Sequence, residues 1–430
     1  MYTSPSGHGH YVLASDSPMG PFKKITGNAG HSIDGSVLID DDGQWYFYWA
    51  DHSGILGCRM SSPTGFGEPV NTGAFMHGWT EGPMIVKYND RYHMTYTGNH
   101  YLSRGYRINA AVSDDPLSGY EDNERNPVII HTEGGGVGLG HSSTVLGPDL
   151  HTRYIVYHNI NPDASRDLNI DPVIIDEEGI YVYGPSRDNQ PAPKMPDFCD
   201  RFDTEQTQKY WDIYRGEWAL QDGYYVSGAA PFRCFGKVSL DRAGVFECHM
   251  RATASGNAEY GILIGREDTF NKIALNPGRD EVRLIDGRGK CRAAARLPED
   301  FVHTALHCLR VSYDREGAIL YVDGRKQMET LPIVCEGDHI GYFSDGLSIS
   351  MGYTAYSHGT DAAARDQLYL PVPGGMPLRG RKKIVQRINV SKTSVYAVAI
   401  IGDTPFETGA DWTVRVDGAG TQAGIRTHRG

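Results

Sequence analysis

The chain has 430 residues, which is enough for about two or three domains, and its 40% hydrophobic and 22% charged residues describe an ordinary globular protein. Its formal net charge of -12 argues against a nucleic-acid partner or an anionic membrane surface, because both attract Lys and Arg. No apolar run of about 18 residues is present, so no membrane-spanning helix is expected.

Two further features bear on where the protein acts. Residues 1–10 contain no basic stretch followed by an apolar one, so we expect no signal peptide, and a cytoplasmic protein if this N-terminus is native. The seven cysteines are an odd number without a CxxC pair. This pattern favours reduced thiols over a disulfide framework or a zinc site.

The first 184 residues contain the same strand–turn–strand unit several times. Short apolar and aromatic runs at 35–40 and 45–51 flank an Asp-Asp-Gly turn, and similar pairs follow at 83–88 with 91–97 and at 142–146 with 153–158. The units recur roughly every 45 to 60 residues, which is typical of the blades of a β-propeller. The high contents of Gly (52) and Tyr (26) suit such an all-β fold.

A second region follows the stretch 185–196, whose four prolines and few large apolar residues predict a linker. Residues 197–360 alternate polar and apolar positions in regularly spaced strands, and this pattern predicts a β-sandwich. Within it, the segment LRVSYDREGAILYVDG (309–324) resembles the concanavalin-like or laminin-G-like jelly roll, a resemblance that concerns architecture. The last stretch, 361–430, is expected to be a β tail or a partial module.

Three short motifs occupy corresponding places in successive propeller units. They are SIDG (32–35), TEGP (80–83) and GHSS (140–143), each at the start of the first strand of a blade. First strands line the central channel of a propeller, so an Asp, a Glu and a His are expected to converge on one cavity. Hydrolysis of a glycosidic bond needs such a set, because one carboxylic acid protonates the leaving oxygen and a carboxylate activates water.

Four longer segments carry a family resemblance. SIDGSVLIDDDGQWYFYWA, WTEGPMIVKYNDRYHMTYTGNHY, YRINAAVSDDPLSGYEDNERNPVI and GHSSTVLGPDLHTRYIVYH follow one another in an order and spacing that resembles glycoside hydrolase family 43. YVLASDSPMGPF near the N-terminus is similar to that family as well, and the resemblance covers about residues 8–183. It implies a five-bladed propeller that hydrolyses arabinofuranosides, xylosides and related linkages with inversion.

The resemblance also implies roles for individual residues. Glu81 corresponds to the general acid, and Asp34 to the carboxylate that tunes and orients it. His141 corresponds to an axial histidine that helps to hold a central cation through water, so a structural calcium is the one metal considered; no cofactor is expected to be required. Trp79, Asn99 and Arg166 are expected to contact substrate, because sugars stack on aromatic faces and their hydroxyls bond to polar side chains.

The chain departs from the family pattern at its beginning. The family's general base lies in an Asp-Pro motif on the first blade, and no Asp-Pro precedes HYVLASDSPMGPF (10–22). Asp115-Pro116 and Asp171-Pro172 fall in later units and are not matches. The propeller is therefore expected to be incomplete, without its first blade and part of its second, and His8, His10 and Asp16 are the titratable residues nearest to that gap.

These observations predict a glycoside hydrolase acting on plant cell-wall pentose glycans, of the arabinofuranosidase or β-xylosidase type. The alternative is a carbohydrate-binding protein with a degenerate propeller and no hydrolysis. The retained Asp34, Glu81 and His141 favour the enzyme, whereas the missing Asp-Pro motif favours the binding protein. An oligo- or polysaccharide is the expected partner, and open sheet edges in an incomplete propeller predict a homo-oligomer.

Overall fold

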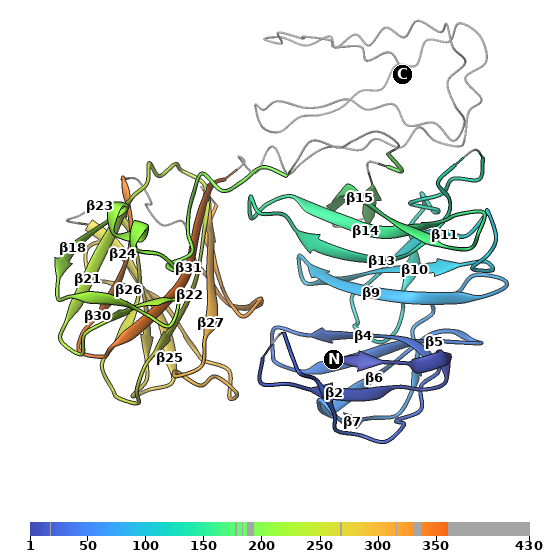
Figure 1. Ribbon diagram of the computed structural model, residues 1–430, viewed down its shortest axis with the longest axis horizontal. Helices are drawn as coiled ribbons and strands as arrows, with labels where there is room; N and C mark the ends of the chain where they lie inside the picture. The colour runs from blue at the N-terminus through green and yellow to red at the C-terminus, as the bar shows by residue number, and fades with distance from the viewer. Residues whose placement is uncertain are drawn as a thin grey trace, which may run out of the picture. The chain divides into compact units, whose positions relative to one another are not determined.

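The computed structural model (Figure 1) describes most of the chain up to residue 359. The described residues are 1–17, 19–133, 135–176, 179–182, 184–186, 193–266, 269–314, 316–330 and 337–359. All of these described residues fall within one compact unit. The predicted β tail at 361–430 and half of the predicted linker, residues 187–192, lie outside the described residues.

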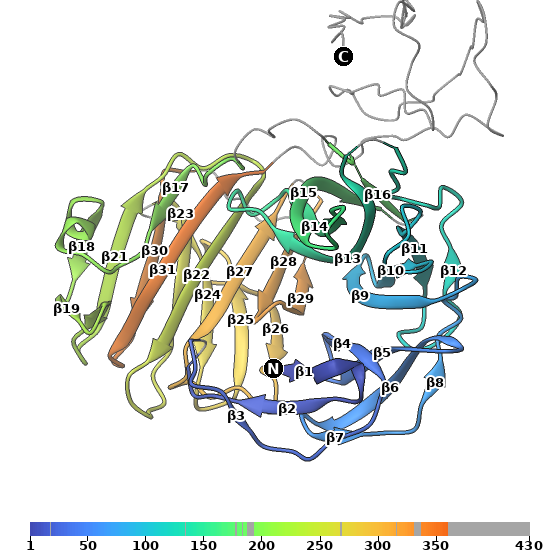
Figure 2. The ribbon, with the colours of Figure 1, turned by 45° about the vertical axis from the view of Figure 1, so that its right-hand side comes forward.

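Four antiparallel sheets follow one another along the first 182 residues, in the manner of propeller blades. Their strands are β1 (Tyr2–Thr3), β2 (Tyr11–Ala14) and β3 (Lys23–Lys24); β4 (Ile33–Ile39), β5 (Trp45–Asp51), β6 (Gly54–Ser62), β7 (Gly65–Phe66) and β8 (Val70–Asn71); β9 (Thr80–Tyr88), β10 (Arg91–Gly98), β11 (Arg107–Ser113) and β12 (Glu121–Asp122); and β13 (Val137–Leu146), β14 (Arg153–Ile160), β15 (Arg166–Ile175) and β16 (Ile180–Val182). Figure 2 shows the blades arranged along an arc, with β4, β9 and β13 on its inner side.

Alternation along the middle strand of each blade explains why the blades stack. Successive side chains of a strand point to opposite faces. In β5, Tyr46 and Tyr48 join the apolar cluster shared with the β9–β12 blade, whereas Phe47 and Trp49 join a cluster that includes Tyr2 of β1. The strand β5 is thus buried on both faces between its neighbouring blades. The all-β propeller arrangement that the sequence predicted is confirmed.

The turns follow the predicted chemistry. In the β4–β5 hairpin, the amide of Asp40 donates to the carbonyl of Gln44, and Gly43 adopts a φ of 82°. The β9–β10 hairpin turns at Asn89 and Asp90, which have φ values of 48° and 58°. Asn, Asp and Gly tolerate this left-handed region best, so these sequences specify the two hairpins.

A buried ion pair joins the second and third blades. Asp40, with a side chain 7% exposed, accepts hydrogen bonds from Lys87 Nζ (2.5 Å) and from the hydroxyl of Tyr92. Asp41 Oδ2 lies 2.9 Å from the same ammonium group. The Asp-rich turn therefore does more than reverse the chain, because its carboxylates hold β9 and β10 against β4.

Two large antiparallel sheets make up residues 198–358. The eight-stranded sheet contains β17 (Phe198–Asp200), β19 (Trp218–Gln221), β20 (Tyr224–Ser227), β22 (Gly244–Ala252), β27 (His307–Tyr313), β28 (Ala318–Val322), β29 (Arg325–Thr330) and β31 (Ile349–His358). The seven-stranded sheet contains β18 (Trp211–Arg215), β21 (Phe232–Lys237), β23 (Tyr260–Arg266), β24 (Thr269–Asn276), β25 (Glu281–Ile285), β26 (Cys291–Arg296) and β30 (His339–Ser344).

Both sheets contribute to one hydrophobic core. In β22, Phe246, Cys248 and Met250 are fully buried in it, and Ile262 and Tyr342 enter it from the seven-stranded sheet. A shared core between two sheets supports the predicted β-sandwich. The intervening residues of β22 point to the other face of the sheet and are half-buried.

Regular helix is confined to short 3₁₀ turns at Pro5–Gly7 and Glu205–Lys209 in the part of the chain that is described. No helix among these residues is long and apolar enough to cross a membrane. Hydrogen bonds also connect the two β regions of this compact unit: the Lys326 amide donates to Asp41 Oδ1 at 2.7 Å, and Arg310 donates to the carbonyl of Leu150.

Candidate active site

The three predicted motifs share one backbone feature, a β-bulge near the start of the inner strand. In each of the three blades the pairing register between the inner and the middle strand shifts near the start of the inner strand. A shift lies between Ile33 and Ser36 in β4, between Glu81 and Met84 in β9, and between Gly140 and Ser143 in β13. The first residue of each bulge has a positive φ: 62° at Asp34, 60° at Gly82 and 51° at His141. Such bulges redirect side chains locally, so the repeated sequence positions are also repeated in conformation.

The bulges are bonded to one another from blade to blade. Asp34 Oδ2 accepts the amide hydrogen of Gly82 at 3.1 Å and lies 3.7 Å from Nδ1 of His141. The amide of His141 in turn donates to Thr97 Oγ1 at 2.9 Å. A Cβ on Gly82 would lie 3.3 Å from the Cα of His141, so the blades approach closely here. The structure thus brings Asp34, the Glu81–Gly82 turn and His141 together.

Glu81 is fixed by two hydrogen-bond donors. Trp79 Nε1 donates to its Oε2 at 2.6 Å, and the hydroxyl of Tyr106 donates to its Oε1. Tyr106 is fully buried, and it precedes β11, 25 residues after Glu81. Burial, followed by the negative charges of Glu81 and Asp34, raises the pKa of Tyr106 far above its ordinary value, so this hydroxyl keeps its proton.

Tyr106 extends the site to His158 of the fourth blade. Its ring stacks on that of His158, with centroids 5.8 Å apart and an interplanar angle of 17°. Burial, with smaller contributions from the charges of Arg166 and His141, lowers the pKa of His158 to about 4. Both ring nitrogens of His158 lack a hydrogen-bond partner within the described residues. His158 is therefore a neutral ring that supports Tyr106.

Sequence reasoning missed Tyr106 and assigned no role to His158. Tyr106 occupies a loop before a strand, and no local pattern marks it as a partner of Glu81. The signal for His158 was its position: it pairs with Gly140 across β13 and β14 and so lies beside the GHSS motif.

The remaining predicted contacts differ in how free their side chains are. Arg166 is exposed at the start of β15, and its charge acts on Tyr106 and His158. The side chain of His141 is 45% exposed. Asn99 is half-buried, and its amide group bonds within its own loop, to the amide of His100 (2.8 Å) and the carbonyl of Gly105 (3.4 Å). Arg166 and His141 are thus more available to a ligand than Asn99.

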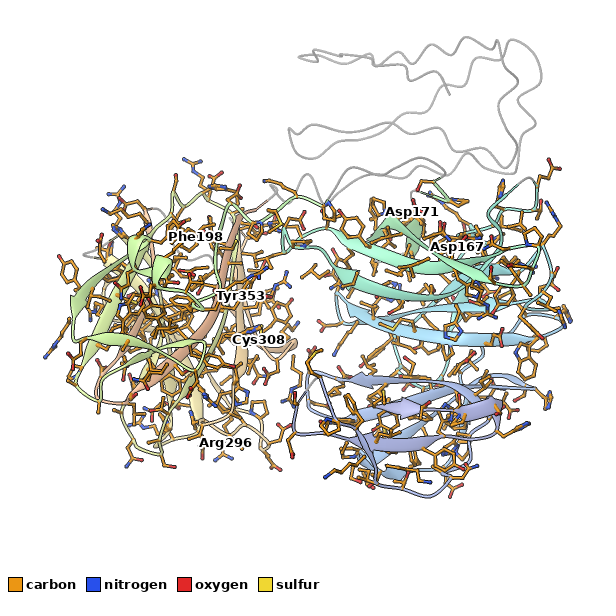
Figure 3. All side chains as sticks on the ribbon, in the orientation of Figure 1. Asp167, Asp171, Phe198, Arg296, Cys308 and Tyr353 are labelled. Atoms are coloured by element: carbon orange, nitrogen blue, oxygen red, sulfur yellow. The ribbon has the colours of Figure 1, made fainter. Side chains whose placement is uncertain are left out.

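The residues considered near the missing base have other environments. His10 is 1% exposed, and its Nε2 accepts the amide hydrogen of Gly35 at 2.8 Å, directly beside Asp34. Asp16 is exposed on the segment after β2. Asp115 caps the turn at Leu117 and Ser118, and Asp171 (Figure 3) is fully buried and accepts from the hydroxyl of Tyr157. The residue that meets the Asp34 bulge from the N-terminal segment is therefore a histidine, His10, which directly precedes β2.

The predicted calcium ion would need more ligands than the contacts at His141 supply. Calcium prefers six to eight oxygen ligands. Asp34 offers a carboxylate and His141 a nitrogen, and within the described residues the one compact trio of potential metal-binding side chains lies elsewhere. A cation held through water at His141 remains a prediction.

This geometry defines an all-β propeller with acidic and aromatic side chains gathered where its inner strands begin. The family described as "Glycosyl hydrolases family 43" matches residues 1–181, the same residues that form the four blades. The predicted family for the N-terminal region is thereby confirmed. No curated protein sequence matches the chain.

Several solved structures resemble the chain. A thermostable family 43 glycoside hydrolase is 30% identical over 45% of this chain and 72% of that chain, with a TM-score of 0.41. A mutant of the family 43 protein BlXynB from Bacillus licheniformis is 18% identical, with 81% of this chain and 79% of that chain covered and a TM-score of 0.39. An arabinoxylan arabinofuranohydrolase from Bacillus subtilis is 16% identical, covering 83% and 76%, with a TM-score of 0.35. The family match covers residues 1–181, so the likeness to glycoside hydrolase family 43 belongs to this N-terminal region.

Proposed function

We propose that this protein is a glycoside hydrolase that removes pentose units from plant cell-wall glycans, of the arabinofuranosidase or β-xylosidase type. The observation that carries the proposal is Glu81, whose two carboxylate oxygens are held by Trp79 and Tyr106 inside a region matched by family 43. Asp34 lies on the neighbouring inner strand, bonded to the residue after Glu81. A carboxyl group held in a fixed orientation is suited, in its protonated form, to donate a proton to the leaving oxygen of a bound substrate.

The donor types limit where the acid proton of Glu81 resides. Trp79 Nε1–H can only donate, so Oε2 remains an acceptor. The Tyr106 hydroxyl both donates and accepts, and it can accept from Glu81 when that group is protonated. The proton of the general acid is therefore best held on Oε1. It would pass from there to the departing glycosidic oxygen, while a water molecule attacks the anomeric carbon with inversion.

Activation of that water needs a base, to which we assign no residue. Asp34 is engaged with Gly82 and faces His141, which suits the support of Glu81 better than the deprotonation of water. Arg166 and His141 are exposed beside the pair and are proposed to contact the sugar hydroxyls. Trp79 would offer the rest of its ring to the sugar.

The test is release of pentose from a panel of arabino- and xylo-oligosaccharides by the full chain and by its Glu81→Gln variant. Glu121→Gln, a substitution at an exposed residue of β12, is the control. We expect the wild type and the control to release pentose and Glu81→Gln to lose activity by about 10²–10⁴-fold, the usual contribution of general acid catalysis.

Calorimetric binding of the same oligosaccharides separates the two candidate functions. Glu81→Gln that binds without cleaving supports a catalytic Glu81. If the wild type binds a pentose oligosaccharide and releases nothing from any member of the panel, the hydrolase is refuted and the carbohydrate-binding protein takes its place. The observation that favours this alternative is the contact of His10 with Gly35, where a histidine rather than a carboxylate meets the Asp34 bulge.

A further inference from the structure

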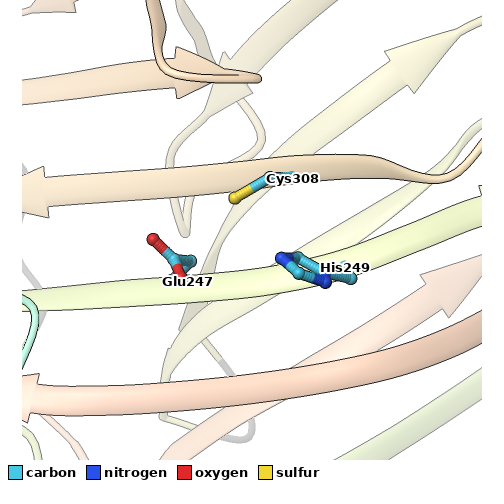
Figure 4. A group of neighbouring side chains, drawn as sticks. All are labelled: Glu247, His249 and Cys308. Atoms are coloured by element: carbon cyan, nitrogen blue, oxygen red, sulfur yellow. The ribbon is translucent and has the colours of Figure 1, made fainter. Parts of the chain in front are cut away.

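A compact group of metal-binding side chains lies on the eight-stranded sheet, in the second β region. Glu247 and His249 project from β22, and Cys308 projects from the adjacent β27. One ligand atom from each residue lies within 4.8 Å of the other two. Figure 4 shows the three side chains on one face of the two strands.

The register of the β22–β27 ladder fixes how close the three side chains lie. Glu247 and His249 are two residues apart, so they share a face of β22, and His249 pairs directly with Cys308 across the ladder. Directly opposed residues have Cβ atoms about 5 Å apart. The trio therefore rests on two paired strands near the middle of the sheet rather than on loops, and only small side-chain rotations are needed to bring the atoms onto one ion.

All three side chains are half-buried, which sets them apart from ordinary surface residues. The face on which they lie is opposite to the apolar core, because the alternating residues Phe246, Cys248 and Met250 fill that core. Tyr353 of β31 covers one side of the group, with its ring centroid 5.2 Å from that of His249 (Figure 3).

The charges around the group are mixed. Arg310 Nη1 lies 3.8 Å from Glu247 Oε2, a long ion pair whose arginine also donates to the carbonyl of Leu150. On the other side, Asp323 accepts the amide hydrogen of Cys308 at 2.8 Å. Arg310 therefore has a second partner and Glu247 is only loosely held, which leaves a carboxylate oxygen for another ligand.

We propose that Glu247, His249 and Cys308 form a binding site for one divalent transition-metal ion, with Zn²⁺ as the ion that best fits these ligands. Thiolate, imidazole and carboxylate are the three ligand types that zinc takes in proteins, and three protein ligands leave one tetrahedral position open. Binding forms a sulfur–metal bond and releases the thiol proton of Cys308 to solvent. Zn²⁺ with one thiolate and one carboxylate carries no net charge, which lowers the cost of holding the ion in a half-buried site.

This inference is independent of the proposed glycosidase, because the trio is not part of the propeller. It also differs from what the sequence predicted, since the odd number of cysteines without a CxxC pair favoured reduced thiols. The six cysteines of the described residues are free, so Cys308 is available as a ligand.

The test uses the full chain, stripped with a chelator and titrated with Co²⁺. A thiolate ligand produces a ligand-to-metal charge-transfer band, and four-coordinate cobalt produces intense visible bands. We expect both bands to saturate at one ion per chain and to be displaced by Zn²⁺. Cys308→Ser should remove the charge-transfer band, and His249→Gln and Glu247→Gln should each weaken binding by more than about tenfold.

Cys291→Ser, at an exposed thiol of the seven-stranded sheet, is the matched control and should leave the titration unchanged. Zinc should raise the melting temperature of the wild type and this control, and not that of Cys308→Ser. Should Cys308→Ser fail to fold, His249→Gln retains the thiol and still tests the site by its weakened band. Absence of a charge-transfer band in the wild type, or a band that survives Cys308→Ser, would overturn the proposal.

Discussion

At the scale of single residues, the surroundings of Glu81 matter more than its exposure. Trp79 and Tyr106 approach its two oxygens, and Tyr106 is itself clamped by stacking on His158. The indole N–H of Trp79 can only donate, whereas the hydroxyl of Tyr106 can donate or accept. The two groups therefore hold the Glu81 carboxyl in place and still allow it to be protonated. This arrangement makes Tyr106 a positioning residue for the proposed acid.

We therefore predict that Tyr106→Phe lowers kcat about tenfold and changes KM little, because the ring and its stacking remain while one hydrogen bond to Glu81 is lost. Steady-state kinetics on the best oligosaccharide of the panel measures this. Tyr101→Phe, at an exposed tyrosine of a nearby loop, is the control. An unchanged kcat in Tyr106→Phe would mean that Trp79 alone positions Glu81.

At the scale of elements, the bulge of β9 depends on Gly82. Its φ of 60° is costly for a residue with a Cβ, by about 1–2 kcal/mol, and that Cβ would press on His141. We predict that Gly82→Ala reduces the free energy of unfolding by at least this amount and lowers activity, because Glu81 precedes it. Urea unfolding and pentose release test both effects. Gly27→Ala, where a Cβ meets nothing within 4 Å, should change neither.

The ion pair between blades provides a second prediction at this scale. Burial raises the pKa of Asp40, but hydrogen bonds from Lys87 and Tyr92 outweigh it and hold the pKa below its ordinary value. We predict that Asp40→Asn costs about 2–3 kcal/mol of stability, since it leaves a half-buried ammonium group with one partner. Asp114→Asn, which breaks an exposed pair with Arg91, should cost less than about 1 kcal/mol by the same urea titration.

Elements specified by residues close together in the sequence were predicted better than those that depend on distant segments. The β4–β5 and β9–β10 hairpins were confirmed because their turns and alternating strands are local. The strand β9 begins at Thr80 rather than near Pro83, since the bulge lets pairing continue past the Gly82–Pro83 kink. Asp34, Glu81 and His141 were singled out because their motifs recur at the starts of the inner strands. The structure aligns Gly82, the residue after Glu81, with Asp34 and His141, and the roles of the three residues stay predictions.

What the sequence could not predict depends on contacts between distant segments. Tyr106 reaches Glu81 through the packing of one blade on the next, and Cys308 meets His249 across a ladder that joins residues 59 positions apart. Asp40 ends the predicted run 35–40 before the turn, and only the proximity of Lys87 shows its role in an ion pair. Local patterns specify hairpins, whereas these partners depend on strand order and register.

At the scale of the whole molecule, one buried and one half-buried histidine make stability depend on pH. His93 is fully buried, and burial with the charge of Arg91 lowers its pKa to about 4; His158 has a pKa of about 4 as well. In the unfolded chain both have a pKa near 6.5. The unfolded state therefore binds more protons below pH 6.5, and stability is full above this value and falls as pH drops towards 4.

We predict that acidification from pH 7 to pH 5 costs about 2 kcal/mol for His93 alone. Urea unfolding at the two pH values measures the loss, which should be smaller in His93→Gln. His100→Gln, at an exposed histidine, should behave as the wild type. Equal pH dependence in wild type and His93→Gln would show that this ring is not the group responsible. Size measurement at micromolar concentration would separately test the predicted homo-oligomer.

The repeated bulge has a consequence for engineering. Each of the three inner strands has a left-handed residue at its bulge, namely Asp34, Gly82 and His141. Asp, Asn, Gly and His are the residues that accept this conformation most readily. At Asp34 and His141 the side chain can therefore be exchanged within this set without a new loop or strand, whereas Gly82, where a Cβ would press on His141, cannot be exchanged in this way.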